Sequence, residues 1–396
     1  MPGIRPSQPV VVEAARGVRS GAGEEGARGD QVVKTESVRL VGPADEPFSL
    51  ELGGGLTEVD IAYETYGTLA PDRDNVVLVC HALTGDAHAA GRHAADDKRP
   101  GWWDEAIGPG KVIDTDRFFV VCSNVLGSRY GSTGPCSINP ATGEAFGVDF
   151  PVITVGDMVR AQALVLDAIG IERVYAVTGG SLGGMQALAW LERFPKRVRR
   201  IVPVCAAPRL TAQAQALNHV GRRAVLGELE RGDSAGVAAE RSGLGVARML
   251  AHISYLSCAG MEERFVREPS PFGGPRSRFD QGYPVETYLD HQAETFAARF
   301  DAATYLHLTA AMDRCDIPLD RLDPESDGAS PVVRFIAYDT DWLYPPEQSV
   351  EAARTLRARG FDADATVVHS SAGHDGFLVD VDAMRDVFER ALGAPG

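Results

Sequence analysis

A serine flanked by glycines is the residue best placed to do chemistry in this sequence. Ser181 lies in GGSLG, residues 179–183, which fits the pattern G-x-S-x-G. The run 173–178 before it is apolar and β-branched, and the run 182–195 after it has helical spacing. A sharp strand-to-helix turn of this kind exposes a nucleophilic hydroxyl. A plain glycine turn whose serine caps the helix fits the same residues, so both interpretations stay open on this stretch alone.

A serine hydroxyl is a poor nucleophile at neutral pH unless a base takes its proton. In a strand–turn–helix setting, an acidic residue and then a histidine follow the serine along the chain, each after a later strand. Asp339 and Asp341 come directly after the apolar run 332–338. We favour Asp341 because it lies deeper in the loop, and Asp339 is the alternative.

The histidine of such a site should follow the last strand. His374 lies in a glycine-flanked loop after the run 365–370, where it is free to face the serine. His369 falls inside that run, so we expect it in the core or at a sheet edge. The sequence thus predicts a nucleophile, acid and base in Ser181, Asp341 and His374.

Attack on a carbonyl places negative charge on its oxygen, which two backbone N–H groups must stabilise. Leu182, the residue after the nucleophile, supplies one of them. The other is expected from the loop after an early strand, and the apolar run 75–80 leads directly into HALT, residues 81–84. This loop is therefore the second part of the predicted oxyanion site.

Three histidines, His81, His88 and His93, lie close together in the sequence and raise the question of a metal. Their spacings of seven and five residues suit neither one face of a helix nor a known set of ligands. We therefore predict no metal site.

The elements that must position these residues alternate between strand and helix. Strand-like runs cover 75–80, 117–124, 173–178, 200–205, 332–338 and 365–370, and helical stretches cover 155–170, 182–195 and 346–360. Near-continuous apolar strands separated by helices are typical of a mostly parallel sheet covered on both faces. The predicted fold class is α/β, doubly wound.

The alternation stops between about 209 and 328, where the sequence has helical segments and no convincing strand. We interpret residues 209–328 as a mainly helical lid inserted into a core formed by 37–208 and 329–394. Residues 1–36 are rich in Gly, Ala, Arg and Glu and are predicted to be a disordered leader without a secretory signal.

Composition narrows the class of protein. The 396 residues carry a net charge of −16, which argues against binding of nucleic acid. No apolar run reaches 18 residues, so we predict no membrane span. The six cysteines are scattered without a C-x-x-C pair, which favours small buried hydrophobes in a reduced, cytoplasmic compartment over disulfides or zinc.

Taken together, these residues resemble the homoserine O-acyltransferases of the methionine pathway, within the α/β-hydrolase superfamily. The similarity covers nearly all of 37–392. It is carried by YETYGTL, CHALTGDAH, GWWDEAIGPGKVIDTDRFFVVCSNVLG, GSTGPCSINPATG, FGVDFPVITVGDMVRAQ, GGSLGGMQALAW, ARMLAHISYLS, DTDWLYPPEQS and GHDGFL.

The resemblance implies a role for each matched position. It makes Ser181 the nucleophile, Asp341 the triad acid and His374 the base, and it places the second oxyanion N–H at Leu83. Two further positions match substrate contacts, Asp375 for the ammonium group and Arg248 for the carboxylate.

The sequence departs from the family pattern at two places. Leu182 stands where the family usually has methionine, which a backbone donor tolerates. Ser128, Arg129 and Tyr130 stand where the family often has Gly-Cys, in a loop that we expect near the acyl or substrate pocket.

The implied activity is transfer of an acetyl group from acetyl-CoA to the side-chain hydroxyl of L-homoserine through an acyl-serine intermediate. No bound cofactor is implied, since acetyl-CoA is a substrate, and relatives are often homodimers through the lid. Alternatives on the same scaffold are a succinyl donor, a serine acceptor, plain ester hydrolysis, or a catalytically dead binding module.

Overall fold

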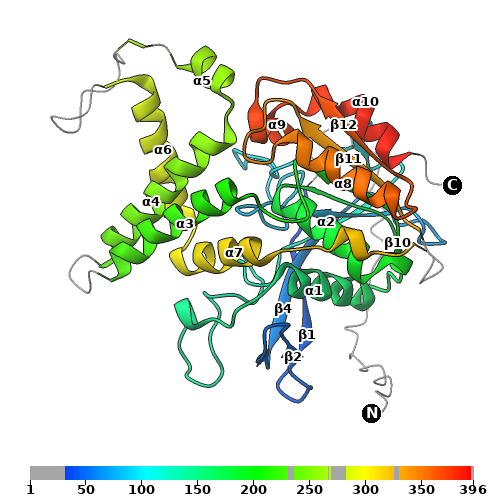
Figure 1. Ribbon diagram of the computed structural model, residues 1–396. Coiled ribbons are helices and arrows are strands. Elements are labelled where there is room, and N and C mark those ends of the chain that lie inside the picture. Colours follow the sequence, from blue (N-terminus) through cyan, green and yellow to red (C-terminus); the bar gives the residue numbers. More distant parts are fainter. Residues whose placement is uncertain (1–31, 231–235, 266, 269–281, 325–329, 394–396) are drawn as a thin grey trace.

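One eight-stranded sheet forms the centre of the molecule (Figure 1). The computed structural model describes residues 32–230, 236–265, 267–268, 282–324 and 330–393, so most of the predicted leader lies outside the described residues. In spatial order the strands are β1 (Glu36–Val41), β4 (Val59–Tyr66), β8 (Phe119–Ser123), β5 (Val76–Cys80), β9 (Val174–Gly180), β10 (Val198–Val204), β11 (Val332–Tyr338) and β12 (Ala363–Val368).

The sheet is parallel from β8 to β12, and β4 pairs antiparallel with both β1 and β8. Every apolar run predicted to be a strand overlaps one of these parallel strands, which confirms the α/β class. Neither β1 nor the antiparallel β4 was predicted. Most residues of β1 are exposed or half-buried, so this edge strand lacks the continuous apolar run that marks the parallel strands.

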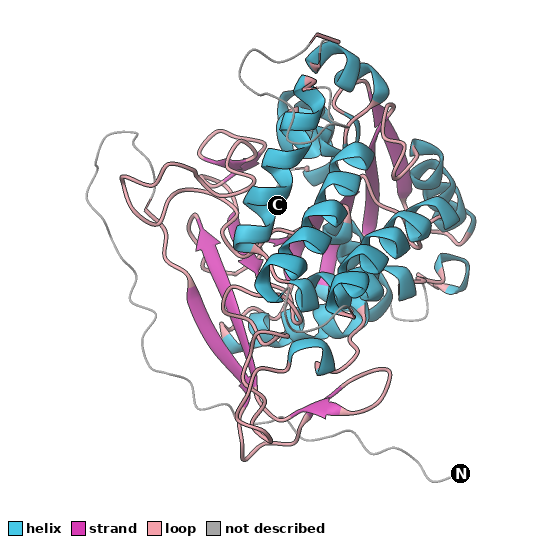
Figure 2. Cartoon of the chain, turned by 90° about the vertical axis from the view of Figure 1, so that its left-hand side faces the viewer, coloured by secondary structure: helices cyan, strands magenta, loops and turns pink. Residues whose placement is uncertain are grey.

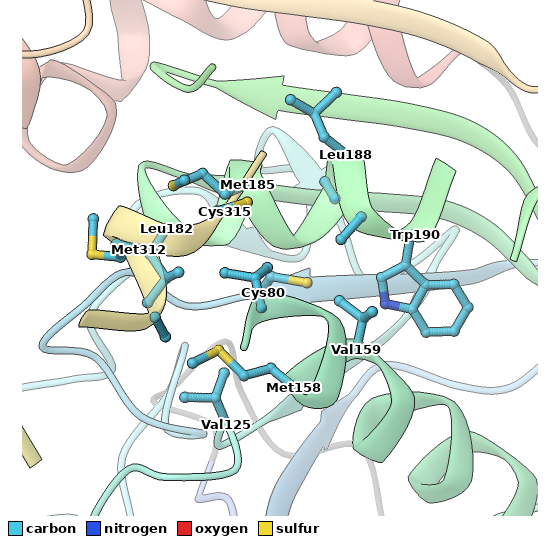
Figure 3. Packing of buried hydrophobic residues seen from close by; sticks show 14 of the residues in the cluster. Cys80, Val125, Met158, Val159, Leu182, Met185, Leu188, Trp190, Met312 and Cys315 are labelled. Atoms are coloured by element: carbon cyan, nitrogen blue, oxygen red, sulfur yellow. The ribbon is translucent and has the colours of Figure 1, made fainter. Parts of the chain in front are cut away.

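Helices cover both faces of the sheet. α1 (Val155–Ala168), α2 (Leu182–Arg193) and α8 (Pro346–Ala358) contribute to one hydrophobic core, and α10 (Val381–Leu392) contributes to the other. Thr154 and Asp157 form a reciprocal capping box that starts α1. Figure 3 shows Met185 and Trp190 of α2 beside Met158 of α1, with the buried Cys80 of β5 among them.

Smaller elements complete this part of the chain. Two short strand pairs are β2 (Phe48–Ser49) with β3 (Gly55–Leu56) and β6 (Ile107–Gly108) with β7 (Ile113–Asp114). Short helical turns are η1 (Gly147–Asp149), η2 (Pro195–Arg197), η3 (Leu319–Arg321), η4 (Gly373–Asp375) and α9 (Gly376–Val379).

Between β10 and β11 the described residues form helices and no strand. They are α3 (Ala212–Leu229), α4 (Gly236–Tyr255), α5 (Cys258–Arg264), α6 (Pro284–Arg299) and α7 (Ala302–Arg314), called here the helical insertion. Side chains of Thr211, Ser257 and Asp301 cap α3, α5 and α7. The insertion stands to the left of the sheet in Figure 1, and in Figure 2 its helices lie in front of the strands.

The helical insertion reaches the carboxyl ends of the parallel strands, because α4 contacts η4. In doubly wound sheets this edge is where ligands bind. None of the described helices is both long and apolar enough to cross a membrane.

Candidate active site

Ser181 lies at a strained turn between β9 and α2. Its backbone has φ 57° and ψ −122°, a left-handed conformation that costs a residue with a side chain about 1–3 kcal/mol. The turn presses against the β5 backbone, since a Cβ at Gly179 or Gly183 would lie 2.2 or 2.1 Å from the Cys80 carbonyl oxygen. Glycine is therefore required on both sides of the serine.

The geometry decides between the two interpretations of the glycine motif. Ser181 occupies the N-cap position of α2, but its side chain makes no capping hydrogen bond. It lines a cavity instead, with a small part of its surface exposed. A hydroxyl held toward a cavity by a strained backbone fits an exposed nucleophile and not a helix cap.

His374 and Asp341 form a buried pair at the same edge of the sheet. The imidazole Nδ1 donates to Asp341 Oδ2 at 2.7 Å. The other carboxylate oxygen, Oδ1, accepts the backbone N–H groups of Leu343 and Tyr344 at 3.0 and 2.9 Å. The carboxylate therefore fixes both the tautomer and the orientation of the imidazole, and leaves Nε2 for the reacting atoms.

Electrostatics tune the same imidazole. Burial alone lowers the pKa of His374, but the charge of Asp341 and the hydrogen bond to it act in the opposite direction, and Asp375 adds to them. The net effect raises the pKa above the usual histidine value. Such a base accepts a proton readily, as general-base catalysis requires.

Two aromatic rings connect His374 to the serine turn. Tyr344 stacks on the imidazole with ring centroids 5.1 Å apart and lines the same cavity as Ser181. Phe377 meets the imidazole edge-on at 5.8 Å, and a Cβ at Gly180 would lie 2.3 Å from the Phe377 ring. The structure thus pairs the predicted acid and base, and Tyr344 and Phe377 connect that pair to the turn that carries Ser181. Sequence reasoning did not identify the two aromatic residues, although each lies within three positions of a predicted triad residue.

Asp339, the alternative acid, is paired with a different histidine. His369 Nδ1 lies 2.5 Å from Asp339 Oδ2, and the His369 side chain is 90% exposed. His369 was expected in the core or at a sheet edge. It directly follows β12, the edge strand that ends at Val368, and its side chain points into solvent, so only the core alternative is wrong. Asp339 therefore has no part in positioning His374.

The predicted oxyanion loop is held by His81. Its Nε2 accepts the N–H of Val125 at 3.0 Å, so Nδ1 carries the proton and donates to the Ala82 carbonyl at 2.8 Å. Burial lowers the pKa of His81 and keeps it neutral. Leu83, two residues further on, lines the cavity with Ser181. His81 is thus a structural residue, and it does not join His88 and His93.

Arg248 and Asp375 lie on opposite sides of the same region. Arg248 of α4 is half-buried, with its guanidinium carbon 4.8 Å from the Phe296 ring and 5.8 Å from the Tyr255 ring, and its Nε is buried without a hydrogen-bond partner. Within the described ranges neither charged group forms an ion pair. Burial lowers the pKa of Arg248 and raises that of Asp375, and each group partly offsets the shift of the other.

The cavity at Ser181 is small and mostly apolar. It encloses about 50 Å³ between the sheet edge and the helical insertion. Its walls include Leu83 from the oxyanion loop, Ala247 from α4, Tyr305 and Met312 from α7, and Tyr344. No residue described in its wall carries a charge.

The loop at residues 128–130, where the sequence differs from the family pattern, contacts Arg299 at the end of the insertion helix α6. The Tyr130 hydroxyl donates to the Arg299 carbonyl at 2.6 Å, and Arg129 donates to the same oxygen at 3.2 Å. The Arg299 guanidinium in turn donates to the Thr84 carbonyl at 3.2 Å. The end of α6 is thereby connected to the loop that carries Leu83.

Sheet order and a serine at the turn after β9 define a protein of the α/β-hydrolase class, and residues 75–381 match a family model described as the alpha/beta hydrolase fold. A homoserine O-acetyltransferase of Methanosphaerula palustris is 47% identical over 353 residues, covering 87% of this chain and 71% of the relative. A homoserine O-succinyltransferase of Magnetococcus marinus is 45% identical over 381 residues, covering 92% and 94%. The chain belongs to the homoserine O-acyltransferase family.

A solved structure agrees with this assignment. The homoserine O-acetyltransferase from Bacillus anthracis superposes with a TM-score of 0.81 at 28% identity, covering 92% of this chain and 99% of that one. The resemblance seen in the sequence motifs is therefore confirmed at the level of the family and of the fold.

Proposed function

We propose that this protein transfers the acetyl group of acetyl-CoA to the side-chain hydroxyl of L-homoserine, giving O-acetyl-L-homoserine for methionine biosynthesis. The observation that carries the proposal is that Arg248 and Asp375, two charges without an ion-pair partner among the described residues, lie beside the His374–Asp341 pair. An amino acid carries one carboxylate and one ammonium group, which are the complements of these two charges. A plain esterase has no use for both.

The first half of the reaction acylates the serine. His374 Nε2 takes the proton of Ser181 Oγ as that oxygen attacks the thioester carbonyl of acetyl-CoA. The backbone N–H groups of Leu83 and Leu182 hold the oxyanion, and each is worth about 3 kcal/mol of transition-state stabilisation. The tetrahedral intermediate collapses, the C–S bond breaks, and the CoA thiolate leaves with the proton from His374.

The second half uses the same groups in the reverse sense. Arg248 and Asp375 hold the carboxylate and ammonium groups of homoserine, so that its hydroxyl faces the acyl-serine. His374 takes the hydroxyl proton, the alkoxide attacks the acyl carbonyl, and the same two N–H groups hold the oxyanion. The bond to Ser181 Oγ breaks and the serine recovers its proton from His374. Asp341 stabilises the imidazolium in both halves.

The lining of the cavity favours acetyl over succinyl. No residue described in the wall beside Ser181 carries a charge. A succinyl group would bring a carboxylate against an apolar wall without a cation, which costs several kcal/mol. The Magnetococcus relative carries the succinyltransferase name at similar identity, so donor choice must be measured directly.

Transfer instead of hydrolysis requires that water stay away from the acyl-serine. The helical insertion closes over the cavity, with Ala247 and Met312 in its wall. We propose that it acts as the lid of the enzyme, over core segments 37–208 and 329–394.

We further propose that the enzyme needs no bound cofactor, works in the cytoplasm and forms a homodimer through the insertion. Val220 of α3 and Val246 and Ile253 of α4 support the last point, because these apolar side chains are 53%, 48% and 38% exposed. Light scattering of the purified chain tests it.

The function is tested by thiol release from acetyl-CoA and succinyl-CoA, each with L-homoserine, with L-serine and without acceptor. We expect fast release only from acetyl-CoA with homoserine, and an acetyl adduct on Ser181 by mass spectrometry when the acceptor is omitted. Preference for succinyl-CoA or serine would overturn the substrate assignment but keep the triad. Equal release without acceptor would make the protein a hydrolase.

A further inference from the structure

Three side chains that could bind a metal meet outside the active site. Glu64 of β4 is fully buried, and its carboxylate faces His88 and His93 from the loop that follows β5. His88 Nδ1 lies 3.0 Å from Glu64 Oε2, and His93 Nε2 lies 2.7 Å from Glu64 Oε1. The two imidazole rings lie against each other, with centroids 3.9 Å apart. Two imidazoles and one carboxylate thus point to a common place.

The spacing of these atoms fits a tetrahedral ion. Zinc bonds of about 2.0–2.1 Å place neighbouring ligand atoms about 3.3 Å apart. The separations of 3.0 and 2.7 Å between the histidine nitrogens and the Glu64 oxygens are shorter than that value, and all three ligand atoms lie within 4.8 Å of one another. An ion would therefore require the two imidazoles to move slightly apart from the carboxylate.

The surroundings orient the carboxylate and leave a path to solvent. The hydroxyls of Thr35 and Tyr66 donate to Glu64 Oε1 and Oε2 at 2.6 and 2.7 Å, as outer-sphere partners of a metal ligand commonly do. The His93 side chain is 46% exposed and that of His88 is 18% exposed. An ion can therefore enter past His93 without unfolding the sheet.

We propose that Glu64, His88 and His93 bind one Zn²⁺ ion. Two nitrogen ligands select against Mg²⁺ and Ca²⁺, which prefer an all-oxygen shell. A water supplies the fourth position, and the Thr35 hydroxyl stays an outer-sphere partner through Glu64. On binding, each imidazole must present a nitrogen lone pair to the ion, so a neutral ring moves its proton to the other ring nitrogen and a protonated ring releases one proton to solvent.

The ion would clamp the loop 81–93 to β4. Its ligands come from β4, the second strand from the edge of the sheet, and from the loop that also carries Leu83, so the site restrains the approach to the oxyanion N–H without touching substrate. A role of this kind is structural, and the proposal does not depend on the identity of the substrate.

The test is zinc titration by calorimetry of the full chain after chelator treatment, with Co²⁺ as a spectroscopic probe. His93→Gln is the informative variant, since glutamine keeps an N–H donor for Glu64 but is a poor ligand. His369→Gln is the matched control, because it alters another imidazole–carboxylate pair with only one imidazole. His88→Asn, which also keeps a donor, is the second ligand variant. Melting curves in metal-free buffer check that each variant folds.

We expect one Zn²⁺ per chain, a zinc-dependent rise in melting temperature, and the visible bands of four-coordinate Co²⁺. His93→Gln and His88→Asn should each weaken binding by about 100-fold or more, and His369→Gln should change nothing. Equal affinity in the folded His93→Gln variant, or no binding by the parent, would show a metal-free hydrogen-bond network instead.

The same experiment distinguishes zinc bound at Glu64 from zinc bound at a second group of possible ligands in the active site. Cys205, Asp341 and His374 also lie within 4.8 Å of one another, and an ion there would block the active site. Zinc bound at that place would inhibit thiol release and would persist in His93→Gln, an outcome that contradicts the proposal.

Discussion

Two histidine–carboxylate pairs lie after β11 and β12 and differ almost only in their surroundings. His374 Nδ1 is 2.7 Å from Asp341 Oδ2, with side chains 3% and 0% exposed. His369 Nδ1 is 2.5 Å from Asp339 Oδ2, with side chains 90% and 36% exposed. Both carboxylates follow β11 and both histidines follow β12, so chain order alone does not distinguish the pairs.

The difference shows what makes such a pair useful. Asp341 accepts two backbone N–H groups on its second oxygen, and these hydrogen bonds hold the buried carboxylate in a fixed orientation. Aromatic rings of Tyr344 and Phe377 surround the His374 imidazole and exclude water from it. In this low-dielectric setting the carboxylate stabilises the imidazolium strongly, whereas solvent screens the pair at His369.

Substituting the two histidines should give the largest difference in kcat between the two pairs. His374→Ala removes the general base and should lower kcat for thiol release by about 10⁶-fold, as losing the base of a triad does. His369→Ala should leave kcat within about twofold. The measurement is thiol release at saturating acetyl-CoA and homoserine, with melting temperature as the control for folding. Comparable losses in both variants would contradict the assignment of the base.

Substituting the two carboxylates should also lower kcat much more at the buried pair than at the exposed pair, but by less than the histidine substitutions do. Asp341→Asn leaves the imidazole in place but favours the wrong tautomer, and we expect kcat to fall by about 10⁴-fold. Asp339→Asn should change kcat by no more than about twofold. The same assay measures both. If Asp339→Asn proved the more damaging, the assignment of the acid would have to be exchanged.

Much of this site could be predicted from the sequence because the parallel strands are continuous apolar runs. Each run fixes where a strand ends, and the residue types after those ends then point to Ser181, Asp341 and His374. What the sequence could not show was burial, so it left open whether His369 lies in the core or at a sheet edge, and the structure places its side chain in solvent beside the edge strand β12.

Residues brought together from separate elements were harder to foresee. The placement of Arg248 depends on how the helical insertion packs, and only the family resemblance suggested it. Glu64 comes from an unpredicted antiparallel strand, so the spacing of His88 and His93 alone did not indicate a third ligand.

The smallest expected effect concerns pH. His374 must be neutral to accept the serine proton, and its pKa lies above 6.5, so acylation should be lost as pH falls through that raised value. Asp375→Asn removes a neighbouring negative charge that raises this pKa. The acid limb should therefore move to lower pH by less than one unit, so that the rate on that limb rises by less than about tenfold.

Asp339→Asn is the matched control for that shift, because its histidine partner is the exposed His369. The measurement is the pH profile of Ser181 acetylation in single turnover without homoserine, so that loss of ammonium binding at Asp375 does not enter. An acid limb that moved upward in Asp375→Asn, or that moved equally in Asp339→Asn, would mean that the buried pair does not control the base.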